Sequence, residues 1–160
     1  MKQYSGNDSL DETDIAILHE LQTDSSLSNV ELARRVELSA PATHTRVKRL
    51  EQMGIIKRYA AILDYERLGY DMLCFISVSL QMHQPDEVEN FREAMQNLPE
   101  VLECHFVTGG YDYILKVAIR NRQDLQRFLM ECLTPIKAVA QIHTHIVLDD
   151  VKSTTALPLE

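Results

Sequence analysis

The spacing of apolar residues changes once along this chain, and the change limits the folds that the chain can adopt. Up to Gly54, apolar side chains recur every three or four residues, which is typical of amphipathic helices. From Cys74 onward they alternate with their neighbours, which is typical of strands with one buried face. The 160 residues therefore predict two small units, one helical and one mixed, each with a modest core.

Capping residues predict where three helices of the first unit begin. Side-chain oxygens at such positions accept hydrogen bonds from backbone N–H groups that lack a partner within the helix. The caps are Asp11 and Asp14 for a helix over roughly residues 11–22, Ser28 with Glu31 for a short helix ending near Val36, and Ser39 for a third helix, which Pro41 begins and Gly54 ends. Three helices, the last two joined by a tight turn, predict a helix-turn-helix.

The segment Ile55–Leu63 is rich in β-forming residues and predicts a strand or hairpin. Such an element would be the wing of a winged helix-turn-helix, with Lys57 and Arg58 placed against the phosphate backbone. We therefore predict a DNA-binding domain over residues 1–63, in which residues 1–9 form a flexible tail. A linker over residues 64–71 and a second domain over residues 72–160 are predicted to follow.

The second domain is predicted to have the order β-α-β-β-α-β. The strands are predicted from Cys74 and over Val101–Val107, Tyr113–Ile119 and Val139–Asp149, and the helices between Pro85 and Pro99 and over Arg122–Leu133. This order is that of a ferredoxin-like α+β domain, with both helices on one face of an antiparallel sheet. Because the other face also carries apolar residues, we expect a second copy to cover it in a homodimer.

The distribution of charge favours DNA as a partner, although the net charge of −8 argues against nucleic acid at first sight. Between Ala33 and Arg58, seven basic residues against two acidic ones give a local charge of +5. From Tyr65 to the end, eight basic residues against fourteen acidic ones give −6. A basic patch on an acidic chain indicates one unit that faces DNA and another with a different task.

One face of the third helix carries most of the predicted DNA contacts. The candidates for reading base edges are Ser39, Ala42, Thr45 and Arg46, and those for holding phosphates are Arg34, Arg35, Lys48, Arg49, Lys57 and Arg58. The alternative interpretation is a solvated basic surface without a partner. The position of this face on the helix that the motif assigns to DNA favours DNA binding.

Other chemistry-bearing residues leave alternatives open. The Gly109-Gly110 turn is either a plain hairpin or a place where a ligand approaches bare backbone, with Asp112 as a charge partner. His105, His143 and His145 fall on one predicted sheet, but cysteine or carboxylate partners at ligand spacing are missing, so we predict no metal and no cofactor. We see no catalytic set and predict that the protein is not an enzyme.

The remaining bulk features place the protein inside the cell. The three cysteines are odd in number and lie among apolar residues, which favours reduced core thiols over disulfides. No apolar run approaches the roughly 18 residues that span a bilayer, and the first residues lack the apolar core of a signal peptide. We therefore expect a cytoplasmic protein without a membrane partner.

The ordered set of motifs resembles the leucine-responsive/asparagine-regulator (Lrp/AsnC, feast/famine) family of transcription regulators, over nearly the whole chain. The matching stretches are Leu10-Asp11-Glu12-Thr13-Asp14, Ser28-Asn29-Val30-Glu31-Leu32-Ala33-Arg34-Arg35-Val36, Arg46-Val47-Lys48-Arg49-Leu50-Glu51, Gly54-Ile55-Ile56, Glu103-Cys104-His105 and Gly109-Gly110-Tyr111-Asp112-Tyr113. One departure is Glu37, where the family usually has glycine in the helix-turn-helix turn.

The resemblance implies more than the spacing does. It implies dimers that assemble into tetramers or octamers, double-stranded DNA as a partner, and an amino-acid effector, such as leucine or methionine, bound between dimers. The implied effector-binding residues are Thr108, Gly109, Gly110, Tyr111, Asp112, Thr144, His145 and Ile146. Two alternatives remain, an architectural protein that wraps DNA without an effector and a small dimeric α+β enzyme.

Overall fold

The computed structural model describes residues 9–81 and 84–159, so all but the last residue of the predicted tail over residues 1–9 lies outside the described part. The chain divides into two compact units. One comprises residues up to Ile62 together with Lys152–Glu160, and the other comprises Leu63–Val151. The C-terminal segment, which we predicted within the second domain, therefore belongs with the helical unit.

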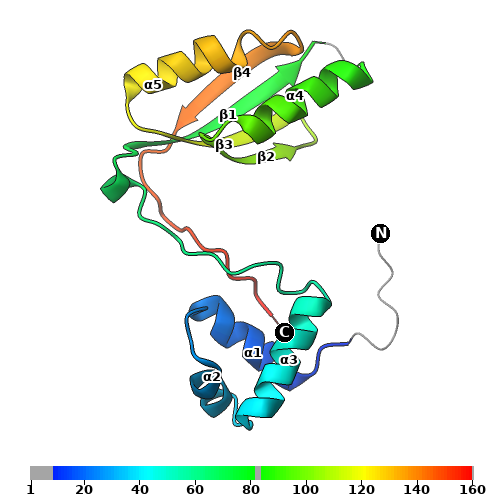
Figure 1. The fold of residues 1–160 in the computed structure, drawn as a ribbon. Helices are drawn as coiled ribbons and strands as arrows, with labels where there is room; N and C mark the ends of the chain where they lie inside the picture. The colour runs from blue at the N-terminus through cyan, green and yellow to red at the C-terminus, as the bar shows by residue number, and fades with distance from the viewer. Residues whose placement is uncertain (1–8, 82–83, 160) are drawn as a thin grey trace. The chain divides into compact units, whose positions relative to one another are not determined.

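The helical unit contains α1 (Glu12–Thr23), α2 (Asn29–Arg35) and α3 (Ala40–Gln52), each preceded by the predicted capping residue (Figure 1). The Asp11 and Asp14 side chains each accept a hydrogen bond from the other residue's backbone N–H, which makes a complete capping box. Ser28 accepts from the Glu31 N–H as expected. The Glu31 carboxylate pairs with arginines of α2 instead of returning to the cap.

The core of this unit is a small cluster between the three helices. Ile17 and Leu18 of α1, Leu32 of α2 and Leu50 of α3 are all buried in it. Leu159, near the C-terminus, packs against the same cluster. Burying such side chains contributes roughly 1.5–3 kcal/mol each, so every helix depends on the other two.

The turn between α2 and α3 contains strained backbone at Glu37, the position where the family usually has glycine. Glu37 has φ 56°, the one non-glycine residue with positive φ in the described part of the chain. A side chain in this left-handed conformation costs roughly 1–2 kcal/mol, because its Cβ approaches the following carbonyl oxygen. The turn therefore keeps the geometry typical of a glycine despite the side chain.

The predicted strand at Ile55–Leu63 is wrong for the chain alone. These residues have no regular secondary structure after the turn that ends α3. Their β-forming side chains favour extended backbone, but a strand also needs a partner for its N–H and C=O groups. None of the other described segments pairs with this one as a strand.

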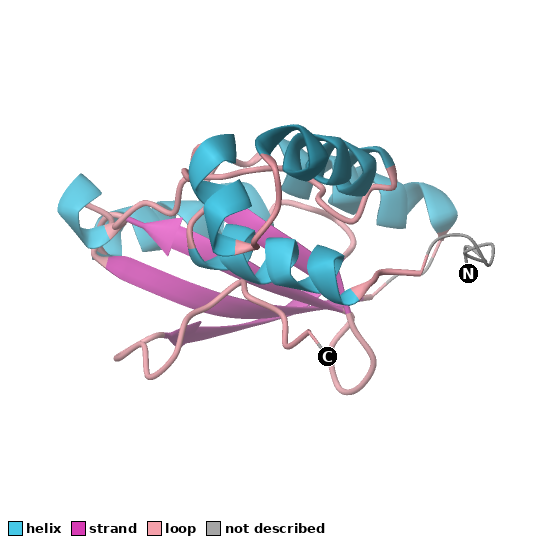
Figure 2. Ribbon diagram, turned by 90° about the horizontal axis from the view of Figure 1, so that it is seen from below, coloured by secondary structure: helices cyan, strands magenta, loops and turns pink. Residues whose placement is uncertain are grey.

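The second unit is a four-stranded antiparallel sheet with the order β2-β3-β1-β4, as a ferredoxin-like domain requires (Figure 2). Its elements are η1 (Glu66–Leu68), β1 (Met72–Leu80), α4 (Pro85–Asn97), β2 (Val101–Phe106), β3 (Tyr113–Ile119), α5 (Arg122–Arg127), η2 (Phe128–Leu133) and β4 (Val139–Ile146). Both long connections between strands thus contain a helix, as the sequence predicted.

Alternation along the strands sets which side of the sheet is buried. Cys74, Ile76 and Val78 of β1 are fully buried and share one cluster with Phe91 of α4 and Phe128 after α5. Both helices therefore cover the same face. The predicted helix over Arg122–Leu133 differs in its second half, where η2 is a π-helical turn, and β4 ends at Ile146 instead of Asp149.

The structure tests the expectations about the cysteines and about membrane-spanning helices. Cys74 is buried and Cys132 is half-buried, but Cys104 is exposed, because β2 lies at an edge of the sheet. Cys104 is therefore a surface thiol of the single chain and not the core thiol that we expected. None of the helices in the described residues is both long and apolar enough to cross a bilayer.

We predict that Glu37→Gly increases the free energy of unfolding by about 1 kcal/mol, because glycine removes the Cβ that strains this turn. Chemical denaturation of the whole protein measures the change. Glu37→Ala is the matched control, since it removes the charge and keeps the Cβ. An equal gain in both variants would contradict the backbone explanation.

Candidate nucleic-acid interface and effector site

A buried carboxylate joins the first and third helices. Asp14 in the first turn of α1 has no exposed surface, and its oxygens accept hydrogen bonds from Arg46 at 2.9 Å and from Arg49. Arg46 also donates to Asp11 at 2.7 Å. A carboxylate removed from water is stable only when it is paired and hydrogen-bonded. The two arginines of α3 therefore satisfy Asp14, and the ion pairs fix α3 against α1.

This arrangement gives Arg46, which we predicted to read base edges, contacts within the chain. Its side chain is only 30% exposed and points to the start of α1. The hydrogen bonds to Asp11 and Asp14 raise the pKa of Arg46, and the hydrogen bond from Arg46 lowers the pKa of Asp11. In the single chain Arg46 thus holds α3 against the start of α1, and its contact with base edges stays a prediction. Arg49, which is 47% exposed, is held by Asp14 but keeps access to solvent.

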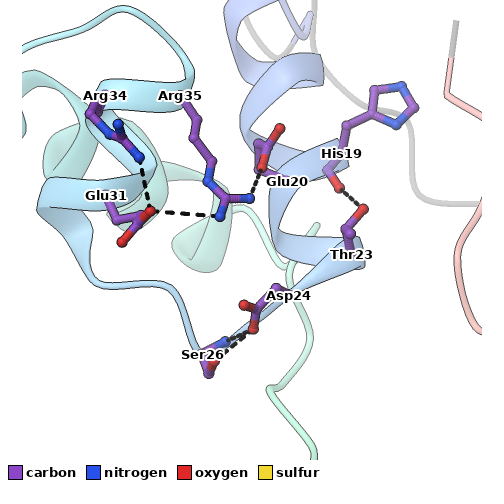
Figure 3. Close-up of polar contacts among 8 residues, drawn as sticks. All are labelled: His19, Glu20, Thr23, Asp24, Ser26, Glu31, Arg34 and Arg35. Atoms are coloured by element: carbon purple, nitrogen blue, oxygen red, sulfur yellow. Dashed lines mark hydrogen bonds and ion pairs between the residues drawn. The ribbon is translucent and has the colours of Figure 1, made fainter.

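A second group of ion pairs joins α2 to the end of α1 (Figure 3). Arg35 donates to Glu20 of α1 at 2.9 Å and lies 3.7 Å from Glu31, and the hydrogen bond to Glu20 raises the pKa of Arg35. Arg34 donates to Glu31 at 3.1 Å and has a 78% exposed side chain. Of the two predicted phosphate ligands on α2, Arg34 is the freer to reach DNA.

The surface of α3 that faces solvent carries a short row of predicted contacts. Ser39, Ala42 and Thr45 are exposed near its N-terminal end, and Lys48 is exposed one turn further. A spacing of three residues follows an oblique ridge of a helix, so these residues lie along a line that is inclined to the axis of α3. We call these four residues the α3 row. Lys57 and Arg58 are also exposed, in the segment that follows the helix.

The turn between β2's end and β3 contains the first five predicted effector residues. Gly109 has φ 123°, a conformation that side chains rarely adopt, whereas Gly110 has ordinary backbone and open space where a Cβ would point. Thr108, Gly109 and Gly110 are exposed. The turn thus presents accessible backbone N–H and C=O groups to solvent.

Asp112 has a structural task that we did not predict. Its carboxylate accepts a hydrogen bond from the Leu80 N–H at 2.7 Å, and its backbone N–H donates to the Val78 C=O at 3.0 Å. The residue thereby attaches the turn to the end of β1. We predicted Asp112 as a charge partner for an effector, and in the structure this carboxylate holds the backbone of β1.

The structure brings His143 of β4 to the turn, a residue that we had considered only as a metal ligand. The ring centroids of Tyr111 and His143 are 5.2 Å apart. The predicted residues Thr144, His145 and Ile146 follow on β4, opposite Ile76, Phe75 and Cys74 of β1, so each lies further from the turn. The signal that would have identified His143 is strand register, which needs the pairing of β1 with β4.

The two cavities described here lie away from the predicted effector residues. A cavity of about 460 Å³ lies between α4 and β2, and another of about 310 Å³ lies beside Tyr70 and Arg120. Neither is lined by any of the eight predicted effector residues. Among the described residues, His, Cys, Asp and Glu side chains form no group of three that would hold a metal ion.

Comparison with known proteins assigns both units. Residues 10–57 match the winged helix-turn-helix DNA-binding family, and residues 73–157 match the Lrp/AsnC ligand binding domain. The chain belongs to the Lrp/AsnC family of DNA-binding transcription regulators. It is similar to the leucine-responsive regulatory protein of Klebsiella pneumoniae, with 38% identity over 99% of this chain and 96% of the relative. This family regulates transcription and is not a family of enzymes.

Solved structures of family members share the fold. A transcriptional regulator of Neisseria meningitidis, solved in a complex with L-Met, has a TM-score of 0.91 and 37% identity over 94% of this chain and 97% of that one. AsnC of Escherichia coli has a TM-score of 0.84 and 29% identity over 94% and 99%. The winged helix-turn-helix and the ligand-binding domain that the sequence predicted are therefore confirmed.

We predict that Asp14→Ala lowers the free energy of unfolding by about 3 kcal/mol, because it removes a buried acceptor of two arginines. Equilibrium urea unfolding of the whole protein measures the loss. Glu12→Ala removes the same charge from the same turn of α1 at an exposed position, and should cost less than about 1 kcal/mol. Equal losses in the two variants would show that the buried ion pairs do not hold α3.

Proposed function

We propose that this regulator binds specific DNA sequences through the α3 row and that an amino acid changes its assembly and its DNA affinity. The observation that carries the proposal is that two arginines of α3 point to a buried carboxylate, whereas other side chains of α3 and its cap face solvent. Arg46 and Arg49 are held by Asp14, whereas Ser39, Ala42, Thr45 and Lys48 face solvent. The surface left for DNA at the helix start carries small, uncharged side chains, whose hydroxyl and methyl groups can contact base edges in a major groove.

The proposed contacts divide by chemistry. Ser39 and Thr45 carry hydroxyl groups, and Ala42 carries a methyl group that fits against the methyl of thymine. Lys48, together with Arg34, Arg35, Arg49, Lys57 and Arg58, is proposed to neutralise phosphates, which positions the row without carrying sequence information. Acidic residues of the same chain already hold Arg34, Arg35, Lys48 and Arg49, so each of these side chains would exchange an ion pair for a phosphate.

The proposed effector is an amino acid such as leucine or methionine, bound at the Thr108–Asp112 turn. Support comes from the ligand-binding family that covers residues 73–157, and from relatives described as leucine-responsive or solved with L-Met. The accessible backbone at Gly110 suits a ligand with an ammonium and a carboxylate group, since both form hydrogen bonds to bare peptide groups. Thr144, His145 and Ile146 stay part of this proposal.

The proposed site is completed by a neighbouring copy of the chain. The turn contributes to neither of the two cavities described above, and its residues Thr108, Gly109 and Gly110 are exposed in the single chain. The face of the sheet away from α4 and α5 carries the exposed Phe75 beside Lys116 and His145. A homodimer through this face, with further assembly into a tetramer or octamer, would cover it.

We predict that Lys48→Ala reduces affinity for an operator DNA three- to tenfold and lowers the slope of log K against log salt by about 0.9, because one phosphate contact is lost. Titration at several salt concentrations measures both quantities. Lys137→Ala, at an exposed position of the other unit, is the control and should change neither. An unchanged salt slope for Lys48→Ala would remove this residue from the interface.

We predict that Gly110→Ala abolishes stabilisation by the effector without altering the stability of the free protein. A methyl group at Gly110 meets no atom of the single chain within 4 Å and requires no strained φ, so the fold accepts it, whereas a ligand bound against this backbone would collide with it. The first step is a thermal-shift screen of the twenty amino acids, in which a ligand at one hundred times its dissociation constant adds about 2.7 kcal/mol. The second step repeats the screen on the variant.

Each result of this screen has a distinct meaning. A ligand that stabilises both forms equally binds elsewhere and contradicts the proposed site. Twenty negative results for the unaltered protein would favour the architectural alternative, a DNA-wrapping protein that needs no effector. In that case the Lys48 experiment still tests the DNA interface, because it requires no effector.

A further inference from the structure

The last residues of the chain are hydrogen-bonded to α1. The Gln22 side-chain amide donates to the Leu157 C=O at 3.2 Å, and its carbonyl oxygen accepts from the Leu157 N–H at 2.6 Å. One primary amide therefore satisfies both polar groups of one backbone residue, as a neighbouring strand would. This pairing depends on backbone and not on the Leu157 side chain, which is 68% exposed.

A leucine two residues further on adds an apolar contact. Leu159 is half-buried and packs against the cluster that contains Ile17, Leu32 and Leu50. The contact thus reaches all three helices, including the α3 helix that presents the DNA-facing row. Pro158 lies between Leu157 and Leu159. Its ring fixes φ at this position and so restricts the backbone that carries both leucines.

The chain therefore enters the DNA-binding unit twice. Residues up to Ile62 and residues from Lys152 belong to this unit, whereas Leu63–Val151 form the ligand-binding unit (Figure 1). The match to the ligand-binding domain extends to residue 157. The contacts of residues 152–157 nevertheless assign them to the DNA-binding unit. The Lys152–Leu159 segment, which we call the C-terminal strap, is physically part of the helix-turn-helix core.

We propose that the surface formed by Gln22 and the apolar cluster is a binding site for the C-terminal strap of the same chain, and that the docked strap raises DNA affinity. Leu159 adds to the apolar cluster that α1, α2 and α3 share, so the docked strap stabilises the unit that presents the α3 row. The occupant is this chain's own segment, because its two backbone hydrogen bonds and its leucine already lie on that surface.

The first experiment removes the strap from the whole protein by ending the chain after Val151. We expect hydrogen exchange of the α1 amides to become about fivefold faster, equivalent to about 1 kcal/mol of lost protection. A synthetic peptide of residues 152–160 added to the shortened protein should restore the slow exchange. The same peptide with Leu159→Ser should not. Unchanged exchange after truncation would overturn the docking.

The second experiment compares matched variants of the whole protein. Leu159→Ser removes a packed side chain, whereas Leu157→Ser removes an exposed one and keeps the backbone pairing with Gln22. We expect Leu159→Ser and Gln22→Ala to reduce DNA affinity by about three- to fivefold through a less stable unit, with Leu157→Ser unchanged. Faster α1 exchange with full DNA affinity would overturn the role in DNA binding.

The source of the strap is tested by dilution. Docking within one chain gives α1 protection that does not depend on protein concentration, whereas docking from a second copy would weaken on dilution. Protection lost on dilution would therefore assign the occupant to another chain and overturn the proposal as stated. None of these measurements uses an effector, so the result stands apart from the proposed amino-acid response.

Discussion

The interaction on which the DNA-binding unit depends is the burial of the Asp14 carboxylate between α1 and α3. An ionised group without exposed surface needs a complete set of donors, and Arg46 and Arg49 of α3 supply them together with the Asp11 backbone N–H. Each partner then restricts the others, because moving α3 would leave a charge unpaired in the core. The direction in which the α3 row faces solvent follows from that restriction.

The same interaction divides the basic residues of the motif into two groups with different tasks. A count of charges between Ala33 and Arg58 gives +5, but the guanidinium groups of Arg46 and Arg35 lie against acidic residues of α1. Lys48 also pairs with Glu51, at 2.8 Å, so the field available to attract DNA comes from fewer side chains than the count indicates. Arginine suits the inward role because its planar group donates to two carboxylates at once, whereas lysine acts as a point charge.

Local rules of sequence predicted most of the fold, and contacts between distant residues account for what they missed. Caps and apolar spacing depend on neighbours within a few residues, so the three helices and the alternation along β1 were predicted correctly. Helical spacing turned Arg46 away from the buried stripe and did not reveal that Asp11 and Asp14 lie within its reach. The strand expected at Ile55–Leu63 needed a partner that pattern alone does not supply, and the pairing of His143 with Tyr111 depends on register across the sheet.

The ligand-binding unit is built so that its exposed turn and its strands share hydrogen bonds. Asp112 ties the turn to β1 at Val78 and Leu80, and Tyr111 contacts β4 through His143. A ligand changes an equilibrium only by binding two states with different affinity, so the ligand proposed for this turn would act by favouring one arrangement of β1 and β4 over another. β4 is also the strand that leads into the C-terminal strap, and the strap ends in the core beneath α3. β4 and the core of the DNA-binding unit are therefore joined by a covalent path that is separate from the linker before β1.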